Sequence, residues 1–266
     1  MAPFLARLIS VWQDTLFPPA CLGCRRLLTR PEFFCPACAG QIQGLPRSVC
    51  RVCGAPLRGT EQGDACLSCQ KMPPAFDQAR ALALYRGPLA EAVRRFKYRR
   101  HWATGAALAG FLAQTAPLNW LGGFGVLAPV PLHPRRLVVR GFNQAAVLGR
   151  GLARKSHLRL APRLLKRLRH TRPQVGLNPL ARRQNVAGAF AVRPADAPRL
   201  KGASVLLLDD VFTTGATADE CARVLKRAGA VKVGVLTLVR AAAGDLLADQ
   251  PPKSYDRASQ EGESDL

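Results

Sequence analysis

The sequence has no uninterrupted run of about 18 or more apolar residues, although 48% of its 266 residues are hydrophobic. A membrane-spanning helix needs about 20 such residues, so no segment is expected to cross a bilayer. The opening stretch MAPFLARLISVWQDTLFPPAC lacks the charged start and clean apolar core of a signal peptide, and Asp14 interrupts it. We therefore expect a short amphipathic helix there, in a cytoplasmic protein of one or two domains with a sizeable core.

The sequence also lacks any Asp or Glu between Glu91 and Asp196, a span that holds twenty Lys and Arg residues and all four histidines. The net charge of the whole chain is +22. A solvated basic face and a compositional excess of Arg are the simpler interpretations. The length of the acid-free span favours a surface that attracts phosphates or nucleic acid. The charge alone does not distinguish a nucleotide from a polymer.

Composition divides the chain into three regions. Residues 1–75 hold eight of the nine cysteines, residues 76–242 alternate strand-like and helix-like segments, and the polar, acidic residues 243–266 are expected to form a disordered tail. The middle region predicts an α/β fold, a parallel sheet with flanking helices. Its last three segments form a βαβ unit, with strands over 203–211 and 230–240 and a helix over 217–229. Earlier strands are expected over 75–87 and 124–132, and helices over 88–100, 102–116 and 142–155.

Eight cysteines form four CxxC pairs: Cys21 and Cys24, Cys35 and Cys38, Cys50 and Cys53, Cys66 and Cys69. Two thiolates on one tight turn can ligate one metal ion, and two such turns complete a tetrahedral site. The spacing therefore predicts a small double zinc-ribbon domain with one or two structural zinc ions. Disulfides would need an oxidising compartment, and a redox CxxC normally occurs once, so both alternatives are disfavoured.

The sequence leaves the pairing of these cysteines open. Sequential pairing assigns the first four to one ion and the last four to a second, while interleaved ligation is also compatible with the spacing. Cys221 stands apart within a predicted helix, where it is expected to be a small buried hydrophobic residue.

The stretch VLLLDDVFTTGATADE runs from an apolar strand through two acids into a helix. Asp209 and Asp210 lie at the carboxyl end of the strand, where open α/β sheets bind ligands. The following residues form a loop before the helix N-terminus, whose free N–H groups favour an anion. Thr217 and Glu220 match a capping box at the start of that helix.

The same stretch has no Lys in a GxxxxGK[ST] frame and no GxGxxG pattern, which excludes the two common nucleotide-binding motifs. A ribose 5-phosphate unit fits instead. Its hydroxyls would bind the two acids, which can also support Mg²⁺. Its phosphate would bind the phosphate loop, which consists of Thr213, Thr214, Gly215, Ala216 and Thr217.

LLLDDVFTTGAT resembles the phosphoribosyl pyrophosphate (PRPP) motif of type I phosphoribosyltransferases. The whole chain except the tail resembles the ComF family, whose members join a cysteine-rich zinc domain to a phosphoribosyltransferase domain and are associated with natural transformation. Besides the PRPP motif, the resemblance is carried by LFPPACLGC, FKYRRHW, PVPLHPRRLVVRGFNQAAVLGRGLA and RHTRPQVGLNPLARRQNVAGAF.

The resemblance implies roles for particular residues. Asp209 and Asp210 would be the catalytic acids that hold the ribose hydroxyls, and the phosphate loop would hold the 5-phosphate. PVPLHPRR lies where the family binds pyrophosphate, which nominates Arg135 and Arg136. RPQVGLNPLARRQN resembles the mobile loop that closes over the substrate, which nominates Arg172, Gln174, Arg182 and Arg183. Any one of these arginines can instead be a solvated surface charge.

The segment RRFKYRRHW interleaves basic and aromatic residues. Phe96, Tyr98 and Trp102 could stack on the bases of single-stranded DNA, or they could face the core of an amphipathic helix. The family is associated with natural transformation, in which imported single-stranded DNA is handled on the cytoplasmic side. The resemblance therefore implies single-stranded DNA and competence helicase or translocation proteins as partners.

Three functions are compatible with the sequence. The first is a PRPP-binding module that handles single-stranded DNA in natural transformation. The second is an enzyme that transfers phosphoribosyl from PRPP to a small acceptor in nucleotide salvage or biosynthesis. The third is a regulatory protein that keeps the fold without the ligand, which the intact acid pair and TTGAT disfavour. No hood that would identify an acceptor is recognisable, so turnover stays open.

Overall fold

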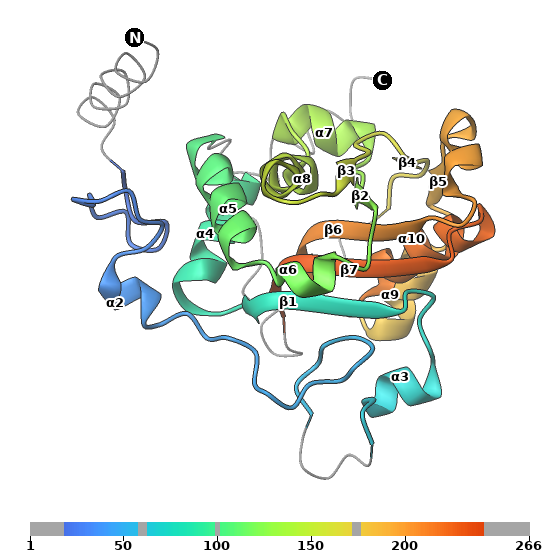
Figure 1. The fold of residues 1–266 in the computed structure, drawn as a ribbon, viewed down its shortest axis with the longest axis horizontal. Helices are drawn as coiled ribbons and strands as arrows, with labels where there is room; N and C mark the ends of the chain where they lie inside the picture. Colours follow the sequence, from blue (N-terminus) through green and yellow to red (C-terminus); the bar gives the residue numbers. More distant parts are fainter. Residues whose placement is uncertain (1–18, 58–62, 99–101, 172–176, 242–266) are drawn as a thin grey trace.

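The computed structural model describes residues 19–57, 63–98, 102–171 and 177–241, apart from the side chains of Tyr98, Trp102 and Pro179 (Figure 1). Its centre is a five-stranded sheet in the order β1-β7-β6-β2-β3. The strands are β1 (Gln78–Leu84), β2 (Val126–Pro129), β3 (Arg159–Leu160), β6 (Ser204–Phe212) and β7 (Lys232–Arg240). All four strand pairs are parallel, which confirms the predicted fold class.

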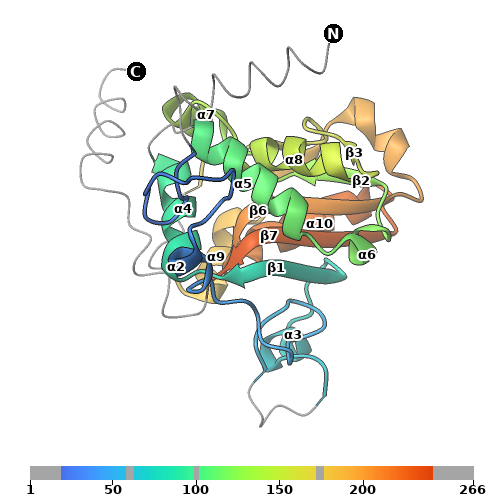
Figure 2. The same cartoon turned by 60° about the vertical axis from the view of Figure 1, so that its left-hand side comes forward.

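Helices cover both faces of this sheet (Figures 1 and 2). On one face α4 (Gly87–Tyr98), α5 (Trp102–Thr115) and α8 (Gln144–Lys155) pack on Leu206 and Leu208 of β6. On the other face α10 (Ala216–Arg227) packs on Val205 and Leu207. A strand buried on both faces needs apolar residues throughout, which explains the continuous run VLLL. Cys221 of α10 is fully buried in the second of these cores, as expected.

Shorter elements connect the main ones. They are α2 (Pro36–Ala39), α3 (Leu67–Lys71), α6 (Leu118–Leu121), α7 (Pro134–Arg140), α9 (Pro179–Val186) and a 3₁₀ helix over Pro194–Leu200. A second, antiparallel sheet pairs β4 (Leu165–Arg167) with β5 (Phe190–Val192). Because Arg167 pairs with Phe190, the two ends of the segment 168–189 lie side by side.

The cysteine-rich region packs on the sheet and covers its free edge. The outer side of β1 donates two backbone hydrogen bonds to this region, from Ala79 N–H to Val52 O (2.6 Å) and from Leu84 N–H to Gln43 O (2.8 Å). Exposed edge strands invite pairing with other chains, so this cover protects the sheet. Figures 1 and 2 show α2 beside α4 and α3 beyond β1.

None of the helices within the described ranges is both long and apolar enough to cross a membrane. The predicted N-terminal helix before residue 19 and the predicted disordered tail at 243–266 lie outside the described residues.

Candidate functional site

The two acids lie at the carboxyl end of β6, as the sequence predicts. The backbone N–H of Asp210 donates to Asp209 Oδ1 at 2.9 Å. Asp210 is 8% exposed, and its Oδ2 lies 3.9 Å from Nζ of Lys97, which α4 carries. Burial, together with the neighbouring Asp210 charge, raises the pKa of Asp209 to about 8. This shift favours the protonated form of Asp209 when no ligand is bound.

The side-chain alternation of β6 reverses across this acid pair. Before it, Leu208 faces the α4–α5–α8 core and Leu207 faces the α10 core. After it, Val211 packs on the α4–α5–α8 side and Phe212 belongs to the α10 core. A regular pleat would place Phe212 on the same side as Leu208. The reversal turns Phe212 toward the start of α10.

Gly215 turns the chain from the strand into α10. It has φ +79° and is the N-cap residue of the helix. A Cβ built onto Gly215 would lie 2.6 Å from Cζ of Phe212, so both the backbone angle and the space require glycine.

The predicted capping box is wrong. Because Gly215 begins the helix, Thr217 already lies inside its first turn. Glu220 accepts instead from the Gly188 N–H at 2.9 Å. The N-cap residue thus offers no side chain to the first N–H groups of α10, and such a helix start suits a phosphate.

Basic side chains converge at Thr171, between α7 and the β4–β5 hairpin. Arg136 Nη2 donates to Thr171 O at 3.0 Å, and Arg167 donates to Thr171 Oγ1. Arg135 is exposed at the start of α7. The structure therefore brings one of the two predicted pyrophosphate arginines into a shared cluster with Arg167.

Arg167 is a residue that the sequence interpretation missed. Its guanidinium lies 5.2 Å from the ring centroid of Phe190, and its Nε is buried without a hydrogen-bond partner. Burial lowers the pKa of Arg167 to about 10, with a further lowering by Arg136 and an opposing effect of the Asp209 charge. The pairing of β4 with β5 places Arg167 in this basic cluster beside Thr171.

The predicted mobile loop is divided by the structure. Arg172 and Gln174 lie outside the described residues. Arg182 is 4% exposed, its Nε donates to Leu177 O at 2.8 Å, and burial lowers its pKa. Arg183 Nη2 donates to Met72 O at 3.4 Å. Both described arginines therefore have structural contacts around α9.

A cavity of about 470 Å³ lies between α9 and α10. Ala216 of the phosphate loop lines this cavity together with Arg183, Glu220, Arg223 and Arg227. Asp209 and Asp210 do not line it. Arg223 pairs with Asp219 at 3.1 Å and with Glu220 at 3.4 Å, so part of its positive charge is compensated. The cavity is adjacent to the phosphate loop rather than part of the acid pair's surroundings.

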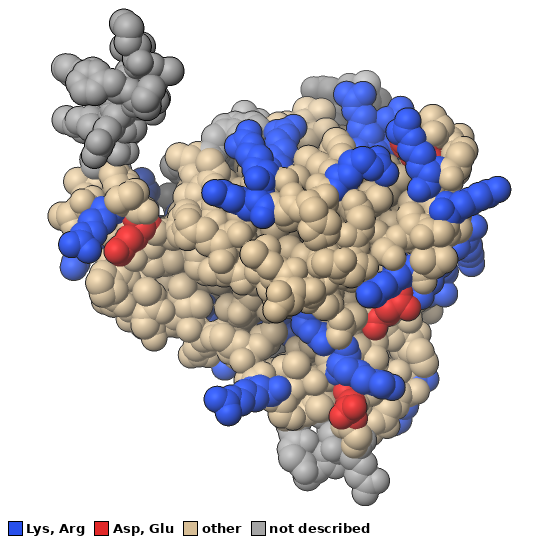
Figure 3. All heavy atoms as spheres, in the orientation of Figure 1, with Lys and Arg blue, Asp and Glu red and all other residues tan. Residues whose placement is uncertain are grey.

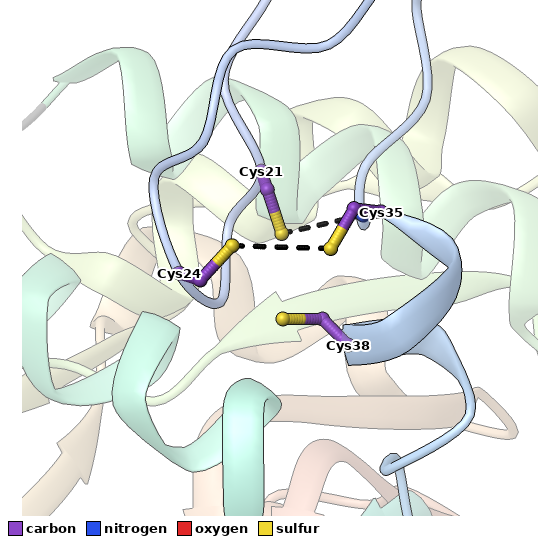
Figure 4. Close-up of side chains that lie close together, drawn as sticks. All are labelled: Cys21, Cys24, Cys35 and Cys38. Atoms are coloured by element: carbon purple, nitrogen blue, oxygen red, sulfur yellow. Dashed lines mark hydrogen bonds between the residues drawn. The ribbon is translucent and has the colours of Figure 1, made fainter.

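The cysteines form two separate clusters, which confirms sequential pairing and excludes interleaved ligation. The first cysteine group is Cys21, Cys24, Cys35 and Cys38 (Figure 4), and the second cysteine group is Cys50, Cys53, Cys66 and Cys69. All four Sγ atoms in each group lie within 4.8 Å of one another. Cys24 Sγ lies 3.8 Å from Cys35 Sγ, and Cys53 Sγ lies 3.7 Å from Cys66 Sγ. Zn–S bonds of about 2.3 Å in a tetrahedron imply Sγ separations of about 3.8 Å, so the residues fit zinc.

The proposed stacking role of Phe96 is wrong. Phe96 is 0% exposed and stacks on Phe142 in the core, with ring centroids 5.3 Å apart. Its spacing from Leu89 and Val93 places it on the apolar face of α4, because residues three and four apart share one helix face. The side chains of Tyr98 and Trp102 lie outside the described residues.

Comparisons with known proteins agree with these two parts of the chain. A double zinc ribbon domain model matches residues 12–70, and a phosphoribosyl transferase domain model matches residues 149–265. Competence protein F of Haemophilus influenzae is 32% identical over 228 residues, which is 83% of this chain and 96% of the relative. DNA utilization protein YhgH of Escherichia coli (strain K12) is 31% identical over 229 residues, 84% of this chain and 97% of the relative. Competence protein ComFC of Bacillus subtilis is 27% identical over 224 residues, 80% of this chain and 87% of the relative.

Among solved structures, glutamine PRPP amidotransferase from B. subtilis is 18% identical with a TM-score of 0.33. The match covers 55% of this chain and 26% of that one, so the chain spans about a quarter of that structure's length. A likeness at this level supports no conclusion about function.

Proposed function

Because the chain belongs to the ComF family of competence proteins, we propose that it binds PRPP and handles single-stranded DNA during natural transformation. In this proposal residues 1–75 form the zinc-ribbon domain and residues 76–242 form the phosphoribosyltransferase-like domain. The observation that carries the PRPP part is the position of the acid pair beside a helix start that lacks a side-chain cap.

The acid pair and the phosphate loop divide the ligand between them. Asp209 and Asp210 accept hydrogen bonds from the two ribose hydroxyls, and Mg²⁺, bound with PRPP, shares their charge. The first N–H groups of α10 and the hydroxyls of the phosphate loop bind the 5-phosphate. Because the raised pKa of Asp209 favours its protonated form without a ligand, we expect binding of Mg²⁺ with PRPP to release a proton and to strengthen as pH rises.

The pyrophosphate group then lies toward the basic cluster. Arg136 and Arg167 supply forked donors there, and the buried Nε of Arg167 is a donor that still lacks an acceptor. Arg135 adds an exposed charge at the same edge. Arg172 and Gln174 keep the closing role that the resemblance implies, while Arg182 and Arg183 support this segment by holding α9.

Transfer of phosphoribose to a small acceptor is the alternative function. The complete acid pair is compatible with transfer, but binding of PRPP alone needs the same acids. The cavity between α9 and α10 does not include the acids, so it does not supply an acceptor site next to them. Release of pyrophosphate, screened with bases and amines, separates turnover from binding alone.

The DNA part of the proposal rests on charge. Figure 3 shows Lys and Arg side chains spread over one face of the molecule with few acids between them, and the whole chain has a net charge of +22. A phosphate backbone binds such surfaces without sequence preference. The relatives named for competence and for DNA utilization agree with this role. The two groups of four cysteines suit zinc rather than disulfides, which are typical of oxidising compartments, and this supports the cytoplasm.

Calorimetry with PRPP and Mg²⁺ tests the ligand site. We expect Asp209→Ala combined with Asp210→Ala to weaken binding by about tenfold to a hundredfold, because hydrogen bonds to charged groups contribute about 1.5–3 kcal/mol. Asp196→Ala is the matched control, since Asp196 pairs with Arg199 at 3.6 Å and lies outside the site. Equal affinity in the double variant and the control would exclude the acids as the ribose clamp.

Titration of labelled single-stranded DNA at increasing salt tests the second part. Binding through phosphate contacts weakens steeply and linearly on a logarithmic salt scale. An absence of binding at low ionic strength would contradict the DNA role without affecting the PRPP site.

A further inference from the structure

Arg240, the last residue of β7, reaches the second cysteine group. Its Nη1 donates to Cys53 O at 2.6 Å, and its Nη2 lies 3.7 Å from Cys53 Sγ. The bond to Sγ is of the kind that orients a metal ligand from outside the coordination sphere. One guanidinium therefore fixes both the backbone and the thiolate of Cys53.

The same guanidinium also contacts the residue that leads into the phosphate loop. Arg240 and Phe212 are register partners in β7 and β6, and the Arg240 Cζ lies 4.6 Å from the Phe212 ring centroid. The Ala241 N–H donates to Phe212 O at 2.8 Å. The strand ends are thus connected through both backbone and side chains.

Phe212 in turn determines the space at Gly215. Its ring lies where a Cβ on Gly215 would come within 2.6 Å of Cζ, and its other neighbour, Phe76, lies edge-on at 5.9 Å. Close-packed interiors transmit such displacements because there is no free volume to absorb them. A shift of this ring therefore displaces the turn that presents the phosphate loop.

We propose that Arg240 is a positioning residue that couples the second cysteine group to the phosphate loop. Zinc fixes Cys53, Cys53 fixes Arg240, and Arg240 fixes the Phe212 ring against Gly215. The coupling is reciprocal, so a ligand on the phosphate loop increases zinc affinity at the second cysteine group. The identity of that ligand as PRPP rests on the proposed function, whereas the coupling itself does not.

Arg80 provides a matched control. It also lies beside the second cysteine group, and its Nη1 donates to Arg51 O at 3.1 Å and to Ala79 O at 2.8 Å. These contacts are on the β1 side and do not involve Phe212. Arg80→Gln removes a guanidinium from the same group without interrupting the connection to the loop.

Hydrogen exchange of the full-length, zinc-loaded protein measures the coupling without PRPP. We expect Arg240→Gln to speed exchange about tenfold in the segment 212–217 as well as in 50–57, whereas Arg80→Gln speeds it only near the cysteines. Arg240→Lys keeps a cation but loses the fork, so its exchange rates should lie between those of wild type and Arg240→Gln. Equal exchange at 212–217 in Arg240→Gln and Arg80→Gln would overturn the proposal.

PRPP with Mg²⁺ then gives the reciprocal measurement. Affinity should fall about fivefold to tenfold in Arg240→Gln and less than about twofold in Arg80→Gln. Bound PRPP should slow exchange at 50–57 in wild type but not in Arg240→Gln. If wild type binds no PRPP, the proposed function fails, and the exchange comparison at 212–217 still decides the coupling.

If Arg240→Gln does not fold, Phe212→Leu tests the same connection from the other side. It removes the ring and leaves the bonds from Arg240 to Cys53. We expect it to speed exchange strongly at 212–217 and less at 50–57, and unchanged exchange at 212–217 would contradict the proposal.

Discussion

The first and second cysteine groups have the same ligands and similar spacing, but they are built into opposite faces of the sheet. Cys21, Cys35 and Cys38 belong to the core beneath α4, α5 and α8. Cys50, Cys53 and Cys66 belong to the core beneath α10. The two groups of the double zinc ribbon thus support different faces of the sheet.

Each group also reaches the candidate ligand site by a different route. Arg95 of α4 donates to Leu22 O and to Gly23 O (2.7 Å) beside the first cysteine group, and Lys97 of the same helix pairs with Asp210. The second cysteine group reaches Phe212 through Arg240. The difference indicates that the first group supports the acid's charge partner, while the second supports the backbone of the phosphate loop.

The largest effects should come from removing one ligand of each group. Cys38→Ser and Cys66→Ser should each lower the zinc content from two ions to one per chain and destabilise the fold by several kcal/mol, because structural zinc contributes folding energy. Hydrogen exchange should then separate the groups. We expect faster exchange in α4 and α5 for Cys38→Ser, and in β1 and residues 212–217 for Cys66→Ser. Identical exchange maps for the two variants would show that the groups are not separate supports.

Gly215→Ala tests the contact between Phe212 and the phosphate loop, the last step of the second route. The change combines an unfavourable φ of +79° with a Cβ 2.6 Å from Phe212, so it should cost about 2–4 kcal/mol and weaken PRPP binding. Gly202→Ala is the control, because it has φ +71° and open space around its Cβ position. It should cost only the backbone strain, about 1 kcal/mol. Urea denaturation of both variants measures the difference, and equal losses would mean that the contact with Phe212 is unimportant.

Much of the central fold could be predicted because its signals are local. The apolar run before Asp209 and the periodic helix after it are found close to the predicted bounds, at Ser204–Phe212 and Ala216–Arg227. The CxxC spacing identified all eight ligands, and the structure decided which four cysteines form each group. These elements are determined by residues close together in the chain.

The parts that could not be predicted depend on contacts between distant residues. Arg167 joins the site only because the three residues of β4 pair with β5 more than twenty residues later. Arg240 ends a strand, and nothing in TLVR indicates a bond to Cys53. Phe96 is a different case. The helical spacing of Leu89, Val93 and Phe96 already favoured a place in the core, whereas the basic residues around Phe96 suggested stacking on DNA bases.

Arg95→Gln tests the first route by removing the guanidinium that binds the carbonyls of Leu22 and Gly23. Two charge-assisted bonds are lost, so we expect a loss of about 1–3 kcal/mol in the free energy of unfolding. PRPP affinity should change less than about threefold, because the phosphate loop is supported from the other face. Arg94→Gln is the control, since Arg94 is bound to Glu91 at 3.0 Å on the same helix, and such pairs contribute little. A larger loss of affinity than in Arg240→Gln would reverse the assignment of the two routes.

The last effect concerns the charge of the acid pair. The pKa of Asp209 is raised to about 8, from an ordinary value of 3.8, so the folded chain binds more protons than the unfolded chain between these pH values. Stability from this group is therefore complete below about pH 4 and is lost as pH rises toward 8. Asp209→Asn removes this dependence, so without Mg²⁺ its thermal midpoint should lie above that of wild type at pH 8 and equal it at pH 4.

Lys97 connects this pH dependence with the first cysteine group. Its positive charge lowers the pKa of Asp209, opposing the effects of burial and of Asp210. Lys97→Gln should therefore move the pH at which stability is lost to higher values, whereas Arg240→Gln should leave it unchanged. Thermal midpoints of the four proteins, measured between about pH 5 and 9 relative to Asp209→Asn, isolate this titration from all other groups. A shift in Arg240→Gln equal to that in Lys97→Gln would mean that both cysteine groups act on the acid pair through the same contacts.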